Sequence, residues 1–124
     1  MKRVFKTRHF SRWMRKNNLT NTVLCQAVEE MAAGLVNADL GGGLVKKRIG
    51  LAGRGKRSGA RTLVATNCES RWFFLFGFEK NERSDIAQDE KEVLQLLAED
   101  LLSRCDEELD AAVADGMLEE ICHE

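Results

Sequence analysis

The first third of the chain alternates apolar and polar residues in a way that predicts one strand and two helices. Residues 3–6 fit a short strand. Thr7 fits the N-cap of a helix that turns three large apolar residues inward at helical spacing, namely Phe10, Trp13 and Met14. Asn17–Asn18 ends that helix, and Thr20 fits the N-cap of a second one that closes before Gly34. The inward face of this second helix carries Leu24, Ala27, Val28 and Met31. A short polar turn between two helices predicts an αα-hairpin.

The middle of the chain has the pattern of three consecutive strands. Residues 44–51 and 60–67 are rich in β-branched and alternating residues, and glycine loops precede them at 41–43 and 53–59. Residues 72–78 are almost wholly apolar, as expected for a central strand that is covered on both faces. Short connections between these strands predict an antiparallel meander.

The last third is predicted to be helical. A helix begins within residues 85–88, and its apolar stripe carries Val93, Leu94, Leu97, Leu101 and Leu102. Asp106 fits the start of a further helix that ends at Gly116, and residues 117–122 can add a helical turn. The order is strand, two helices, three strands and a helix, followed by an acidic helical tail. This order predicts an α+β fold with an antiparallel sheet and helices on one of its faces.

Charge is distributed very unevenly along the 124 residues. The formal net charge is −1, but residues 1–83 hold 17 Lys and Arg against 6 Asp and Glu, whereas residues 84–124 hold 2 against 14. A strongly basic body indicates a polyanionic partner. The alternative is that the acidic segment folds back and neutralises the basic part.

The densest group of cations surrounds the second glycine loop. Arg54, Lys56, Arg57 and Arg61 lie within eight residues, and Lys46, Lys47 and Arg48 come shortly before them. Glycines allow backbone N–H groups to approach phosphate oxygens closely, so the pattern favours a phosphate-rich ligand over a merely solvated loop. A nucleotide P-loop is disfavoured, because Arg57 stands where that motif needs Ser or Thr.

The cysteines and the N-terminus suggest an ordinary cytosolic protein. The four cysteines show no zinc-ligand spacing, and no apolar segment follows the basic start as in a secretory signal. No stretch is long and apolar enough to span a membrane. We therefore expect reduced thiols, a cytoplasmic location and no membrane partner.

Two short motifs carry a family resemblance. The run Gly53–Arg61 (GRGKRSGAR) and the run Phe76–Glu82 (FGFEKNE) resemble the RelE-like toxins of bacterial toxin–antitoxin modules, nearest to the HigB-like branch. The resemblance covers residues 1–104 as a toxin domain and leaves residues 105–124 as an acidic helical C-terminal extension. It implies a small microbial ribonuclease fold that enters the ribosomal A site, contacts ribosomal RNA and cuts mRNA by attack of a 2′-hydroxyl on the adjacent phosphate. It also implies a helix-turn-helix, HigA-like antitoxin as partner, and it calls for no metal or cofactor.

The same resemblance assigns roles to the cations. Lys56 matches a catalytic lysine and is the candidate base, Arg61 matches a phosphate-stabilising arginine, and Lys80 could assist the leaving oxygen. Arg54 stands where relatives often have Lys, and it is a poor base. Further phosphate contacts are expected from Lys46, Arg48, Arg57 and Arg83. The chain has no Tyr, so the general acid stays open.

Several alternatives remain open from the sequence. A non-catalytic toxin of the gyrase-poison kind, or a plain nucleic-acid-binding module, could use the same fold. Trp72 could be buried or could belong to a binding surface, whereas Phe73, Phe74 and Phe76 fit the core. Glu79 and Glu82 could pair for acid–base chemistry or form ion pairs with nearby cations.

Overall fold

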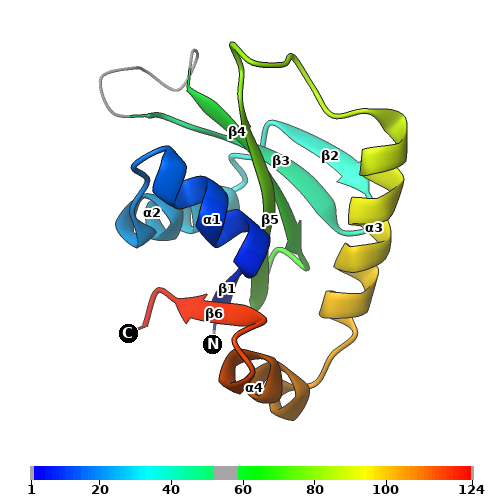
Figure 1. Ribbon diagram of the computed structural model, residues 1–124. Coiled ribbons are helices and arrows are strands. Elements are labelled where there is room, and N and C mark those ends of the chain that lie inside the picture. Colours follow the sequence, from blue (N-terminus) through cyan, green and yellow to red (C-terminus); the bar gives the residue numbers. More distant parts are fainter. Residues whose placement is uncertain (1, 52–58, 124) are drawn as a thin grey trace.

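The computed structural model describes residues 2–51 and 59–123 and confirms the α+β fold (Figure 1). A sheet lies between an N-terminal helical hairpin and a long C-terminal helix. The elements are β1 (Arg3–Thr7), α1 (Arg8–Lys16), α2 (Asn21–Ala32), β2 (Ala38–Gly41), β3 (Leu44–Ile49), β4 (Ala60–Thr66), β5 (Arg71–Glu79), α3 (Gln88–Leu102), α4 (Asp106–Ala114) and β6 (Leu118–Ile121).

The sheet has the order β2-β3-β4-β5-β1-β6. Neighbouring strands are antiparallel except β1 and β5, which run parallel. The chain crosses from one strand to the other through the α1–α2 hairpin and three further strands. The strands β2 and β6 were not expected from the sequence. The helical turn predicted over residues 117–122 is wrong, because Leu118 and Ile121 are buried in an edge strand that pairs with β1.

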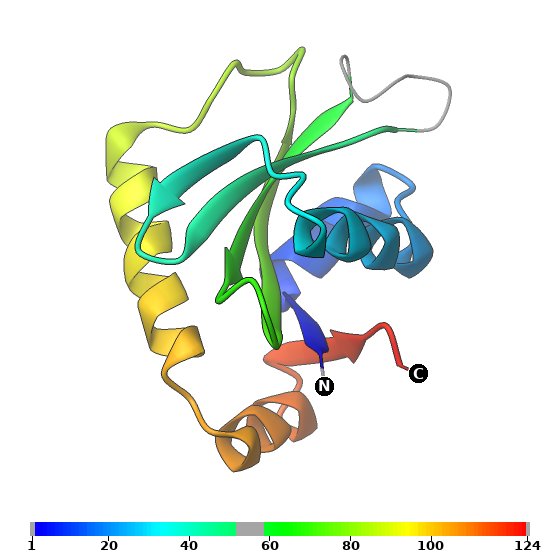
Figure 2. The same ribbon diagram turned by 180° about the vertical axis from the view of Figure 1, so that it is seen from behind.

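Both faces of the sheet are covered, so the expectation of helices on one face is wrong (Figures 1 and 2). The hairpin α1–α2 packs on one face against β-strand residues that include Val64 and Phe74. The helix α3 packs on the other face against residues that include Leu63 and Phe73. Side chains alternate between the faces of a strand, so a strand covered on both sides is apolar throughout, as residues 72–78 are.

The local signals at the helix ends are confirmed. The hydroxyl of Thr7 accepts from the amide of Phe10 at 3.1 Å, and that of Thr20 accepts from the amide of Val23 at 3.4 Å. Gly34 follows α2 with a φ of 96°, a conformation that favours glycine. The predicted stripe of α3 is only partly right, because Leu94 and Leu101 are buried, Leu102 is half-buried, and Val93 and Leu97 are exposed.

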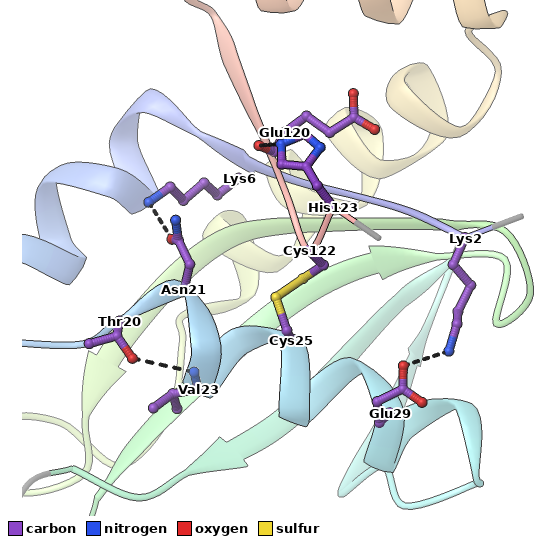
Figure 3. The surroundings of a disulfide bond; sticks show 10 residues. All are labelled: Lys2, Lys6, Thr20, Asn21, Val23, Cys25, Glu29, Glu120, Cys122 and His123. Carbon is purple, nitrogen blue, oxygen red and sulfur yellow. Dashed lines mark hydrogen bonds and ion pairs between the residues drawn. A yellow bond between two sulfur atoms is a disulfide. The ribbon is translucent and has the colours of Figure 1, made fainter.

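A disulfide joins Cys25 in α2 to Cys122 just after β6 (Figure 3), so the expectation of four reduced thiols is wrong for these two residues. The two cysteines are 97 positions apart in sequence. Only the pairing of β6 with β1 brings them together, and that pairing was not visible in the sequence. Cys68 and Cys105 are free and exposed.

The acidic C-terminal segment does fold back on basic residues of the body. The guanidinium of Arg3 contacts carboxylates of Asp106, Asp110 and Glu120 at 2.7–2.9 Å. Further ion pairs of this segment are Arg71 with Asp106 and Lys6 with Glu119. The division of the chain at residue 104 stays a prediction, and its second part contains the helix α4 and the strand β6.

Candidate phosphate-binding site

Three of the predicted cations project from one face of the sheet. Leu44, Lys46 and Arg48 occupy every second position of β3, so their side chains lie on the same face of the sheet. Leu44 belongs to the core beneath α3. Arg61 on β4 lies directly opposite Arg48, and on its other side it pairs with Phe78 of β5. Because Leu44 and Phe78 lie in the core on the α3 side, the two arginines share that face of the sheet.

The pair Arg48–Arg61 places two positive charges on adjacent strands, one on an exposed side chain and one on a buried side chain. Arg61 is only 6% exposed. Burial lowers the pKa of its guanidinium, and the nearby charge of Arg48 lowers it further. Two like charges on adjacent strands repel each other, and a bound anion would offset that repulsion. Arginine presents a planar set of N–H donors, which matches a phosphate group well.

Acidic residues hold the cations around this pair in place. The ammonium of Lys46 lies 2.9 Å from the carboxylate of Asp85, and this contact lowers the pKa of Asp85. The guanidinium of Arg83 binds both carboxylate oxygens of Glu90 and lowers the pKa of that residue. Sequence reasoning missed these two carboxylates, because they come from the acidic part of the chain and approach only in the fold.

Aromatic rings line the same face next to Arg83. Its guanidinium carbon lies 5.6 Å from the ring centre of Phe78 and 6.0 Å from that of Phe76. Phe76 is only half-buried, and the exposed ring of His9 stacks on it at 5.4 Å with an interplanar angle of 5°. Phe73 and Phe74 are core residues as expected, and Trp72 is also fully buried, which excludes it from a binding surface.

The other predicted residues divide into three groups. Lys47 is not part of this site, because it points to the opposite face and binds Glu30 at 2.8 Å. Lys80 is exposed at the end of β5, where its amide donates to the carbonyl of Gly59 at 3.2 Å. The remaining candidates lie outside the described residues, namely Arg54, Lys56 and Arg57.

Two carboxyl groups meet beside the end of β5. The side chain of Glu82 forms a hydrogen bond with that of Glu79, and this contact, helped by partial desolvation and the charge of Glu79, raises the pKa of Glu82. Both interpretations drawn from the sequence, acid–base chemistry and ion pairs with nearby cations, stay predictions.

Within residues 2–51 and 59–123, no group of three or more His, Cys, Asp or Glu side chains is arranged to hold a metal ion.

None of the helices described is long and apolar enough to cross a lipid bilayer.

Comparison with known proteins gives one family. The sequence matches the family model described as the RelE toxin of the RelE/RelB toxin–antitoxin system over residues 2–121. The matched range includes α4 and β6 as well as the sheet face that carries Arg48 and Arg61. No curated protein matches the sequence closely.

Proposed function

The chain belongs to the RelE toxin family of toxin–antitoxin systems, and from that premise we propose that it is a ribosome-dependent endoribonuclease that cuts mRNA in the ribosomal A site. The observation that carries the proposal is the buried Arg61 facing Arg48 on a sheet face rimmed by Lys46 and Arg83. Such a face suits the phosphodiester backbone of RNA. Within the family, the motifs at Gly53–Arg61 and Phe76–Glu82 favour the HigB-like branch.

The proposed reaction is an in-line attack within the RNA strand. The 2′-hydroxyl loses its proton to a base and attacks the adjacent phosphorus, and the 5′-oxygen leaves with a proton. The charge that accumulates on the phosphoryl oxygens is stabilised by Arg61, with Arg48 close enough to share it. Lys56 is the proposed base and Arg54 a further phosphate contact, with Arg57 beside them. Lys80 is proposed to protonate the leaving oxygen.

The proposed partners follow from the same reaction. The toxin binds mRNA and ribosomal RNA in the cytoplasm, and a helix-turn-helix antitoxin of the HigA-like kind neutralises it. Its basic face gives it affinity for the ribosome that falls as salt rises.

Substitution of Arg61 tests the proposal. Arg61→Ala should reduce mRNA cleavage by roughly 10²–10³-fold, the effect of removing one preorganised charge stabiliser. Arg61→Lys should restore little, because a lysine cannot offer two parallel donors. Primer extension on mRNA from expressing cells measures the cleavage. Arg104→Ala is the matched control, since Arg104 lies at the far end of α3 and pairs with Asp100.

The outcomes separate the candidate functions. Circular dichroism and thermal melting should show that Arg61→Ala is folded. Cleavage by this variant at the wild-type rate would contradict the proposal. Intact mRNA together with DNA damage in cells that express the wild type would favour a gyrase poison instead.

A further inference from the structure

A small pocket opens between β5 and the first turns of α3, next to the basic face. It has a volume of about 270 Å³ and is lined by Phe76, Asp89, Glu90, Val93 and Leu94. Pockets for drug-sized ligands measure roughly 300–1,000 Å³, so this one suits a smaller, flat group. Its walls are mostly apolar, and two carboxylates stand at its rim.

The pocket is continuous with the proposed RNA site through two of its own residues. Phe76 lies 6.0 Å from the guanidinium carbon of Arg83, and Glu90 binds that guanidinium directly. Arg83 thus joins the pocket to Phe78, which pairs with Arg61 in the sheet. The pocket and Arg61 therefore lie on the same face of the sheet, so an RNA strand bound at Arg61 could run along that face toward the pocket.

The walls suit an aromatic ring. Phe76 offers a half-buried ring that stacks against His9 on one side, and Val93, which also lines the pocket, is 63% exposed. Nucleobases stack on aromatic side chains with a gain that does not depend strongly on base identity. An exposed valine on a helix that is otherwise acidic in its first turn has no role in the core, so its contact surface is available to such a ring.

The rim favours a base over a phosphate. Carboxylates accept hydrogen bonds only and repel a phosphate group. Glu90 is already engaged by Arg83 and by the amide of Ala87 at 2.8 Å, so Asp89 is the carboxylate that faces a ligand with capacity to accept. Guanine presents two N–H donors side by side on its Watson–Crick edge, which a carboxylate can accept together.

We propose that this pocket binds a nucleobase of the RNA substrate, with guanine preferred, through stacking against Phe76 and hydrogen bonds to Asp89. This subsite rests on the proposed function, since the Arg48–Arg61 pair supplies the phosphate anchor. It makes Asp89 a determinant of sequence preference that takes no part in the proposed bond cleavage.

Methyl NMR on the full chain tests the subsite without requiring cleavage. The probes are the trinucleotides UGU, UAU and UUU with non-cleavable 2′-O-methyl sugars, and the signals are the methyl groups of Val93 and Leu94. UGU should shift these signals and should bind roughly tenfold more tightly than UAU, as one bidentate contact discriminates. Asp89→Asn should remove that preference while leaving the affinity for UAU unchanged. Asp100→Asn, on the same helix but outside the pocket, should keep it.

The proposal is overturned if none of the trinucleotides moves the Val93 and Leu94 signals, or if Asp89→Asn keeps the preference for UGU. It is also overturned if an apolar peptide from the antitoxin moves these signals and RNA does not, because the occupant is then a protein side chain. A failure of the proposed function looks different, since it appears as unchanged cleavage by Arg61→Ala. Binding of UGU at the pocket would survive that result.

Discussion

Removal of the Cys25–Cys122 disulfide should cost a large part of the stability of this protein. The bond closes a loop across 97 positions of the chain, and a cross-link that closes about 100 residues restricts the unfolded state by about 4.7 kcal/mol at 25 °C. With an unfolding entropy of about 2.1 cal/mol/K per residue, that loss corresponds to a fall in Tm of about 18 °C. The double variant Cys25→Ser/Cys122→Ser removes the bond, and what then holds β6 is its pairing with β1 and its ion pairs.

Urea denaturation followed by circular dichroism measures this loss. The double variant should unfold at a lower midpoint and with a somewhat steeper slope, because its unfolded chain is less compact, and wild-type protein in excess dithiothreitol should match it. The control is Cys68→Ser/Cys105→Ser, which removes the two free, exposed thiols and should unfold like the wild type. If the double variant loses less than about 1 kcal/mol, the cross-link either does not form or does not restrict the unfolded chain, and the reasoning is refuted.

Three further predictions concern packing, pH and salt. Gly77→Ala should destabilise the fold by about 1–3 kcal/mol in thermal unfolding, because a Cβ there would lie 2.5 Å from the ring of Trp13; an unchanged Tm would refute it. Glu120→Gln should lower the free energy of unfolding by about 1 kcal/mol at pH 7, because it removes a carboxylate that Arg3 binds. That hydrogen bond lowers the pKa of Glu120, so its contribution to stability is complete above the unfolded pKa of about 4.3. That difference should shrink as the pH falls below this value, and a constant difference in urea titrations would contradict it. Arg48→Ala should reduce the salt slope of single-stranded RNA binding by about 0.7 in filter-binding assays, whereas an unchanged slope would remove Arg48 from the interface.

The parts of the fold that depend on local sequence could be predicted well. Thr7 and Thr20 were identified as N-caps because a capping hydroxyl acts within three residues of its own position. The strand over residues 72–78 was identified because its unbroken apolar run requires cover on both faces. The strand β6 was missed because four residues with two outward carboxylates carry no strand signal by themselves. Its structure comes from β1, more than a hundred residues earlier.

Residue types and strand order were enough to predict part of the candidate site. Register places Arg48 opposite Arg61, so a meander with the correct strands brings the two together. Alternation along the strand already separates Lys47 from Lys46 and Arg48, but its ion pair with Glu30 depends on how α2 packs on the sheet. The contact of Glu90 with Arg83 was also out of reach, since it depends on where α3 begins relative to β5.

The parallel pairing of β1 and β5 affects how the nascent chain can fold, because the two strands are made at different times. The strand β1 leaves the ribosome before the other strands of the sheet, yet its neighbours are β5 and β6, which are made much later. The ion pairs of Arg3 form late in synthesis, because its carboxylate partners are 103–117 positions further along the chain. A nascent chain therefore cannot complete this sheet until β6 has emerged, and it cannot close the disulfide until Cys122 has emerged.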